Sequence, residues 1–133
     1  MKDSVANRAI VIVIDYYKRK GWNVRDVSHT RGEHFGYDLL ATNESEQLMI
    51  EVKGSTRPYG IPDPYGTEFD RETRRLIADV LCVVYFLPDQ PNPMLAVIRR
   101  EDIPPDMVEE KLAYRIKGRF KNERTISKFL VDL

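Results

Sequence analysis

Residues 37–53 read YDLLATNESEQLMIEVK, and the fold that the sequence predicts depends on this stretch. Two short segments rich in apolar residues flank the turn-prone segment 43–46, which is typical of a β-hairpin. Apolar and polar residues alternate along the second segment, so successive side chains point to opposite faces of the predicted strand. This alternation places the charged side chains of Glu51 and Lys53 next to each other on one face.

A four-residue turn fixes the register of this hairpin. Thr42 then pairs with Gln47, and the same register brings Asp38 directly opposite Glu51, with their Cβ atoms ~5 Å apart. Two carboxylates at this separation repel each other unless positive charge lies between them. A divalent cation that prefers oxygen ligands, together with the Lys53 ammonium group, supplies that charge. The sequence therefore predicts a Mg²⁺ or Mn²⁺ site on the hairpin.

The Val52 backbone carbonyl is the expected third protein ligand, because Mg²⁺ also accepts carbonyl, water and phosphate oxygens. The alternative is an exposed, charged sheet face that holds only an ion pair between Glu51 and Lys53. The Glu-x-Lys pattern alone carries little weight, since residues 109–111 contain a second copy of it. The strand pattern and the aspartate across the hairpin distinguish the first copy.

Periodicity and turn residues predict the elements around the hairpin. A helix over 4–20 is favoured by a capping serine and by the glycine that follows it, against the β-branched run 10–14. The other expected elements are a strand at 22–27, a loop at 28–36, hairpin strands at 37–42 and 47–53, an exposed loop at 55–66, a helix at 67–78, strands at 80–87 and 94–99, and a helix with an irregular basic segment from 106 onward. In this last segment, Ile126, Phe129, Leu130 and Val131 are expected to dock on the core.

The composition is that of one soluble globular domain over residues 1–133, with 42% hydrophobic and 32% charged residues. The single cysteine, Cys82, excludes an internal disulfide, favours a reducing compartment, and lies in the most apolar predicted strand as a buried, inert thiol. The longest aliphatic run, 9–14, is too short to span a membrane, and the N-terminus lacks the pattern of a signal peptide. We therefore expect a cytoplasmic (intracellular) protein without a membrane partner.

The charges balance overall, at 21 basic and 21 acidic residues, but they are unevenly distributed. Segment 101–110 carries five acids and no base, whereas 111–128 carries seven bases and one acid. Such a basic segment is able to contact phosphates even on a neutral protein. The alternative is a solvated surface that happens to be basic.

The residues GYD at 36–38 and IEVKGS at 50–55 resemble the PD-(D/E)XK nuclease superfamily. Within it they are similar to the Mrr-like restriction enzymes, and most similar to the protein NO VEIN C-terminal domain family. The resemblance covers about residues 4–103. It implies an α/β fold, a mixed α+β sheet with a restriction-endonuclease-like core in αβββαβ order. A helical and basic C-terminal extension, about residues 104–133, lies outside it.

The resemblance also implies a function, that of a Mg-dependent endonuclease of PD-(D/E)XK type that hydrolyses phosphodiester bonds in DNA, in restriction, defence or repair. It implies that Asp38, Glu51 and the Val52 carbonyl bind Mg²⁺ or Mn²⁺. Lys53 would orient or activate the attacking water, and Ser55 matches a small polar residue that supports the site in relatives. RNA is the alternative substrate, and a homodimer is expected by analogy with relatives that cut both strands as dimers.

The chain departs from the family in the first predicted helix. Many relatives carry a glutamate there that points into the metal site, whereas residues 5–10 contain no acid. Asn7 is the one neutral oxygen ligand in this stretch and is the candidate supporting residue. The departure favours an alternative function, a catalytically weak or inactive nuclease-fold module that binds nucleic acid or a protein partner.

Basic residues near the predicted site and in the tail are candidates for binding phosphates. The candidate nucleic-acid-binding residues are Arg57, Arg71, Arg74, Arg75, Lys111, Arg115, Lys117 and Arg119. For the arginines at 71–75, the alternative is a surface helix on which they pair with neighbouring acids. His29 and His34 are a weaker candidate for a metal pair or a general base, against ordinary polar loop residues.

Overall fold

The computed structural model describes residues 2–28, 36–62, 69–70, 72–110 and 114–133. Helix α1 spans Lys2–Arg19 and helix α2 spans Glu123–Ile126. The strands are β1 Asn23–Asp26, β2 Leu39–Thr42, β3 Gln47–Ser55, β4 Val80–Tyr85, β5 Met94–Arg99, β6 Val108–Glu110, β7 Tyr114–Ile116 and β8 Leu130–Val131. Short 3₁₀ helices occur at Arg100–Asp102, Pro105–Met107 and Ser127–Phe129. In the described part of the chain, no helix has the length and apolar character needed to cross a membrane.

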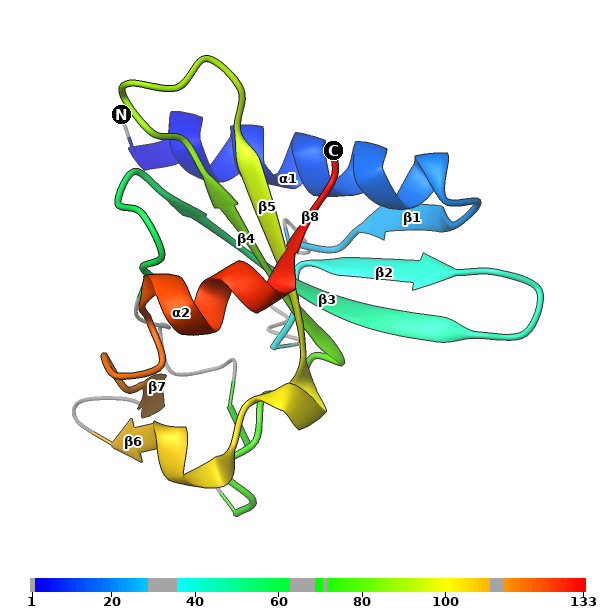
Figure 1. The fold of residues 1–133 in the computed structure, drawn as a ribbon. Coiled ribbons are helices and arrows are strands. Elements are labelled where there is room, and N and C mark those ends of the chain that lie inside the picture. Colours follow the sequence, from blue (N-terminus) through cyan, green and yellow to red (C-terminus); the bar gives the residue numbers. More distant parts are fainter. Residues whose placement is uncertain (1, 29–35, 63–68, 71, 111–113) are drawn as a thin grey trace.

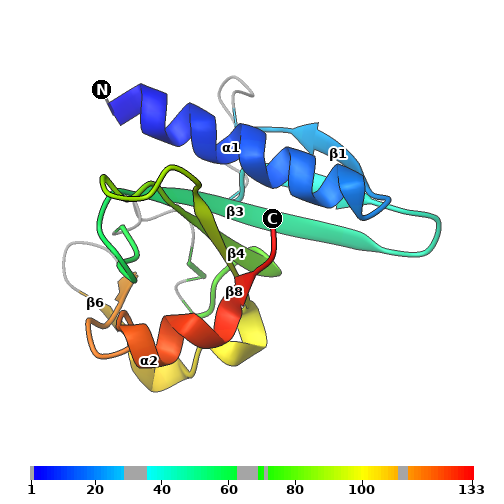
Figure 2. The same ribbon diagram turned by 45° about the horizontal axis from the view of Figure 1, so that its top comes forward.

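Six strands form one mixed sheet in the order β1-β2-β3-β4-β5-β8. Strands β3 and β4 are parallel, and all other neighbours in this sheet are antiparallel. Helix α1 lies across one face of the sheet, whereas α2 and the hairpin of β6 and β7 lie beyond the other face (Figures 1 and 2). The mixed α+β sheet expected from the sequence is confirmed.

Helix α1 confirms the helix predicted over 4–20, but it begins at Lys2, so Ser4 lies within the helix and the prediction that it caps the N-terminus is wrong. Ala9, Val13 and Tyr17 are buried at helical spacing against the sheet, so burial of this stripe outweighs the strand preference of the β-branched run. At the C-terminal end the Gly21 N–H donates to the Lys18 carbonyl, and Gly21 adopts a φ of 93°. This left-handed conformation favours glycine and ends the helix where the sequence indicates.

The predicted hairpin is confirmed as β2 and β3. Thr42 pairs with Gln47, as expected, and the Asn43 N–H donates to the Glu46 carbonyl across the turn. The Asn43 side chain accepts hydrogen bonds from the N–H groups of Ser45 and Glu46, which fixes the turn. The register of the hairpin is therefore set by local turn chemistry.

Two buried clusters lie on opposite faces of the sheet. On the α1 face, Ile50, Val52, Cys82 and Val84 pack against the helix. On the other face, the second cluster consists of strand residues, residues of the β3–β4 connection and residues of the C-terminal extension: Leu81, Val83, Tyr85, Ala96, Ile98, Ile61, Phe69, Leu76, Ala78, Ile103, Val108, Ile116, Phe120 and Ile126. All six residues of β4 are buried, which confirms the apolar central strand.

The prediction of a helix over 67–78 is wrong for the described residues 69–70 and 72–78, so the αβββαβ order lacks its second helix there. Phe69 and Leu76 instead form an isolated β-bridge. Between them, the Asp70 carboxylate accepts hydrogen bonds from the N–H groups of Thr73 and Glu72. These bonds hold the pKa of Asp70 below its usual value, and they divert backbone donors that a helix would need.

The tail does contain a short helix, α2, but the prediction that a helix begins at 106 is wrong. The segment forms a 3₁₀ turn and then the antiparallel hairpin of β6 and β7, in which Glu109 pairs with Arg115. Tandem prolines at 104 and 105 supply no N–H donors, and the β-branched Val108 and Ile116 pair across the strands with both side chains buried. The predicted docking of the tail is confirmed, since Ile126 is fully buried and Phe129, Leu130 and Val131 pack on the core.

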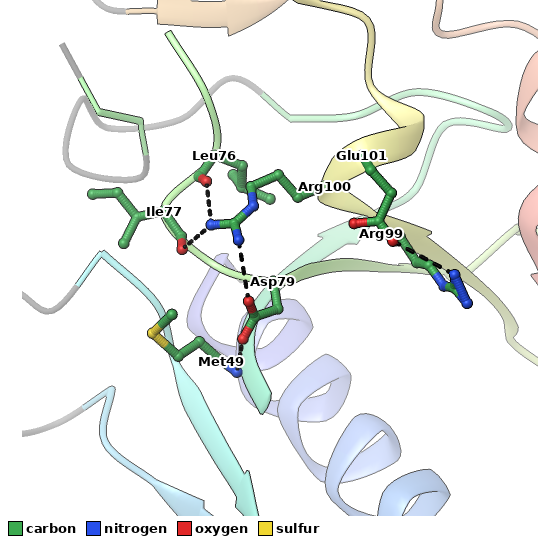
Figure 3. A network of polar contacts seen from close by, with 7 residues as sticks. All are labelled: Met49, Leu76, Ile77, Asp79, Arg99, Arg100 and Glu101. Carbon is green, nitrogen blue, oxygen red and sulfur yellow. Dashed lines mark hydrogen bonds and ion pairs between the residues drawn. The ribbon is translucent and has the colours of Figure 1, made fainter. Parts of the chain in front are cut away.

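A polar network fixes the start of β4 (Figure 3). The Asp79 carboxylate accepts the Met49 N–H at 2.8 Å and pairs with the Arg100 guanidinium at 3.4 Å. The same guanidinium donates to the carbonyls of Leu76 and Ile77. Arg100 therefore holds the end of the β3–β4 connection against the sheet.

Glycine at position 54 allows α1 to approach β3 closely. A Cβ atom at Gly54 would lie 2.8 Å from Val5 Cγ1 and 3.1 Å from the Val5 carbonyl oxygen. Because such a separation is shorter than a van der Waals contact, any side chain here would push the N-terminal half of α1 away from the sheet.

One thiol and two phenol groups are buried in the core, and their burial predicts that the protein is less stable at alkaline pH. Burial raises the pKa of Cys82 to about 12, and it also raises the pKa values of Tyr17 and Tyr85. In the unfolded chain the thiol ionises near pH ~8.5 and the phenols near pH ~10, so the unfolded state loses protons first. We expect the free energy of unfolding to be constant at neutral pH and to fall as the pH rises above about 9.

Urea unfolding measured between pH ~7 and pH ~11 checks this expectation. The matched variant Cys82→Ala should lose the part of the decline that begins near pH ~8.5 and keep the part that begins near pH ~10. A free energy of unfolding that stays flat to the alkaline end of the series would contradict the burial of these groups.

Candidate functional site

Glu51 and Lys53 lie on the face of β3 that points away from α1. Their side chains form an ion pair, with 3.3 Å between Lys53 Nζ and Glu51 Oε2. The two side chains are only 5% and 11% exposed, respectively. The sequence placed them correctly on one face, but the exposed charged surface of the alternative interpretation is excluded by this burial.

Apolar side chains enclose the pair in a small pocket of about 10 Å³. That volume holds roughly one water molecule. The wall consists of residues from β4, from the β3–β4 connection and from the C-terminal extension: Ile61, Pro62, Phe69, Leu76, Leu81 and Ile116. The segments whose structure the sequence failed to predict therefore cover the predicted catalytic residues.

Asp38 precedes β2 and is held by three hydrogen bonds. Its N–H donates to the Ile50 carbonyl, its carbonyl accepts the Val27 N–H, and its carboxylate Oδ2 accepts the Val52 N–H at 2.9 Å. The predicted pairing of Asp38 with Glu51 is corrected, because the ladder ends one residue earlier, at Leu39 and Ile50. Beyond this point the Asp38 carboxylate, and not a strand residue, accepts the N–H of the peptide bond between Glu51 and Val52.

Two of the three predicted ligand groups, the Asp38 carboxylate and the Val52 carbonyl, lie on one edge of β3. The N–H and C=O of one strand residue point to the same side, so the Val52 carbonyl faces the edge on which the Asp38 carboxylate lies. Carboxylate and carbonyl oxygens are the types of ligand that Mg²⁺ and Mn²⁺ prefer, so the chemistry of these three groups suits either ion. Among the described residues, no group of three or more His, Cys, Asp or Glu side chains is arranged to hold a metal.

The two candidate supporting residues lie in different places. Ser55, at the end of β3, is buried, and its hydroxyl donates to the Arg57 carbonyl and accepts the Arg57 N–H. It therefore shapes the turn after the strand. Asn7 is exposed on α1, which covers the opposite face of β3 from Glu51 and Lys53. The structure does not bring Asn7 to their side of the sheet.

The candidate phosphate-binding residues divide into three groups. Arg57, Arg74 and Arg75 are exposed around the β3–β4 connection. In the tail, Arg115 and Arg119 form ion pairs with Glu109 and Asp106, at 2.9 and 3.7 Å, and Lys117 is half-buried. Arg71, Lys111, His29 and His34 lie outside the described residues. The acidic segment thus neutralises part of the basic segment that follows it.

An open groove of about 520 Å³ lies beyond the end of β3, and no local sequence pattern predicts it. Arg57 was a candidate, but Gly118 and Lys121, which complete the lining, were not singled out. Only the fold brings residues about 60 positions apart together here, as shown by the Lys121 ammonium group, which donates to the Ile61 carbonyl at 3.2 Å. The single available signal was the basic composition of the tail.

The enclosed ion pair leads to a prediction about stability. Lys53→Met removes the ammonium group that pairs with the buried Glu51 carboxylate, and we expect the free energy of unfolding to fall by about 3–5 kcal/mol. In the double variant Glu51→Leu/Lys53→Met both charges are absent, so most of that loss should be recovered. Urea unfolding of the single and double variants measures the difference, and a double variant that is less stable than Lys53→Met would contradict the burial of the pair.

The chain is similar to one protein family in sequence and to solved nuclease structures in fold. A family model described as Protein NO VEIN, C-terminal, matches residues 5–61, and no curated protein matches the chain. One similar solved structure is Hjc, a Holliday junction resolvase from the archaeal hyperthermophile Archaeoglobus fulgidus, with 16% identity over 96% of this chain and 91% of that chain and a TM-score of 0.48. Another is the bacterial homing endonuclease I-Ssp6803I, with 18% identity over 74% of this chain and 69% of that chain and a TM-score of 0.47. The resemblance to the NO VEIN C-terminal family is therefore confirmed over the segment that carries Asp38, Glu51 and Lys53.

Proposed function

We propose that this chain is a metal-dependent nuclease-type domain that hydrolyses phosphodiester bonds in DNA, in restriction, defence or repair. The observation that carries the proposal is the position of the Asp38 carboxylate at the Glu51–Val52 peptide, beside the Glu51–Lys53 ion pair. The Asp38 carboxylate lies beside residues 51–53 of β3, which carry Glu51 and Lys53. Two acids and a lysine in this arrangement match the charge pattern expected for phosphodiester cleavage. The free, buried Cys82 is compatible with the reducing, intracellular compartment that we propose.

Each residue has a distinct part in the proposed chemistry. Asp38, Glu51 and the Val52 carbonyl would hold Mg²⁺ or Mn²⁺, which when bound polarises the phosphodiester and makes a water more acidic. Lys53 orients the attacking water and offsets the charge that develops on the phosphate. Its ammonium group is fixed for this role by the Glu51 carboxylate at 3.3 Å.

A second candidate function is favoured by one specific observation, the apolar cover over Glu51 and Lys53. In the described arrangement the pocket at these side chains has room for about one water, so a phosphate group does not fit beside them. Catalysis therefore requires that the apolar residues lining this pocket, such as Ile61, Phe69 and Leu76, move away from Glu51 and Lys53. If the cover stays closed, the chain is a non-catalytic module that binds nucleic acid or a protein partner.

Cleavage of a substrate panel tests the two functions. Plasmid, linear duplex, single-stranded and branched DNA, and RNA, are incubated with the protein and Mg²⁺ or Mn²⁺. In Asp38→Asn the side-chain amide oxygen still accepts the Val52 N–H, and in Glu51→Gln it still accepts from Lys53, so both variants remove a carboxylate while retaining a hydrogen-bond acceptor. We expect DNA cleavage by the native chain and a loss of at least about 10²-fold in either variant.

The controls separate this activity from contamination and misfolding. Lys18→Met, an exposed substitution on α1, should cleave as the native chain does. Unfolding midpoints of all variants are compared to establish that they are folded. Cleavage that survives in both Asp38→Asn and Glu51→Gln would refute the assigned site, and a native chain that binds DNA without cutting it would establish the non-catalytic module instead.

A further inference from the structure

The open groove beyond β3 has no role in the chemistry described above. It has a volume of about 520 Å³ and is lined by the strand end, the following turn and the C-terminal extension, including Ser55, Arg57, Ile61, Pro62, Gly118 and Lys121. This volume lies within the ~300–1,000 Å³ of pockets that bind ligands. The groove therefore has the size of a binding site.

The charge of the groove favours an anionic ligand. Its described lining contains two basic side chains, Arg57 and Lys121, and no acidic one. Arg57 is exposed and has no ion-pair partner among the described residues, while its backbone is fixed by the Ser55 hydroxyl. The Lys121 ammonium group is anchored on the groove wall by its hydrogen bond to the Ile61 carbonyl. Arginine and lysine in this arrangement suit phosphate oxygens.

The backbone of the groove is open to close contact at Gly118, where a Cβ atom would meet nothing within 4 Å. Gly54 and Gly60 also line the groove, but the Cβ position of Gly54 faces Val5 of α1. Glycine lets a ligand approach the peptide groups directly, and Thr56 adds a hydroxyl group to the same surface. A flexible, repeating anion such as a phosphodiester chain uses contacts of this kind without reading a sequence.

The position of the groove relates it to the proposed catalytic residues. Ser55 follows Lys53 by two residues on the same face of β3, so the groove continues the line of Glu51 and Lys53 along the strand. Ile61 and Pro62 line both the groove and the enclosed pocket of the ion pair. These two residues are therefore the partition between the groove and the pocket.

We propose that this groove binds the phosphodiester backbone of one nucleic-acid strand, through Arg57 and Lys121, on the outer side of the Ile61–Pro62 partition. The identity of the ligand rests on the proposed function, which supplies nucleic acid as the partner. The groove holds the strand beside the partition, and movement of the partition then exposes Glu51 and Lys53 to it.

Binding is measured by fluorescence anisotropy with labelled single-stranded DNA, duplex DNA and RNA of one sequence, in EDTA so that no cleavage occurs. Gly118→Leu fills the groove from a position where the added Cβ is unobstructed and the glycine φ is not left-handed, so it should fold normally. We expect Gly118→Leu to weaken binding on the order of tenfold. Arg57→Met and Lys121→Met should each lower the salt dependence of log K by about 0.7–0.9, the value for one phosphate contact.

Lys18→Met is the matched control, because it removes one positive charge from the opposite side of the sheet, where α1 lies. If Gly118→Leu and Lys121→Met bind every probe as tightly as Lys18→Met does, and with the same salt dependence, the groove is not the binding site. Comparison of the probes shows whether the strand is DNA or RNA.

The cleavage assay distinguishes failure of this inference from failure of the proposed function. Loss of binding in Gly118→Leu, in a native chain that cuts no probe, supports the groove and refutes the nuclease. Unchanged binding and an unchanged KM in Gly118→Leu, in a native chain that cuts DNA, refutes the groove and supports the nuclease.

Discussion

The hydrogen-bonding groups of the central strand β3 are the constraint on which the rest of the structure depends. Its two neighbours overlap along it at a single residue, Ile50, since β2 pairs with 47–50 and β4 with 50–55. Each half of the strand would therefore leave N–H groups unpaired on one side. Asp79 accepts the Met49 N–H on the β4 side, and Asp38 accepts the Val52 N–H on the β2 side. Two carboxylates thus accept N–H groups of β3 that no neighbouring strand pairs, and a buried donor without an acceptor would cost about 1–3 kcal/mol.

The same constraint explains where the candidate site lies. Because β2 begins at Leu39, no strand within the described residues pairs with β3 at Val52 on this side, and the Asp38 carboxylate lies there instead. The close approach of α1 at Gly54 covers one face of this half of β3, so Glu51 and Lys53 occupy the other face. The C-terminal extension and the β3–β4 connection close over that face, and Arg100 ties the end of the connection to the sheet.

The sequence predicted those parts of the molecule that local chemistry determines. Helix α1 has its stop signal at Gly21, the hairpin has its turn at Asn43, and β4 is apolar throughout. The prediction failed where long-range packing decides: Phe69 and Leu76 bridge to each other over the ion pair, and the C-terminal hairpin is buried through Ile116. For the site, alternation placed Glu51 beside Lys53 correctly. Their burial under an apolar cover depends on segments distant in sequence, which no local pattern reveals.

The proposed function depends on a divalent cation held at the Asp38 edge of β3. Thermal unfolding of the native chain with increasing Mn²⁺ tests it directly, because a ligand that binds the folded state alone raises the unfolding midpoint with its concentration. Asp38→Asn is the matched variant, since its amide oxygen still accepts the Val52 N–H. We expect the midpoint of the native chain to rise with Mn²⁺ and that of Asp38→Asn to stay constant. Midpoints that respond identically in the two proteins, or in neither, would contradict the claim.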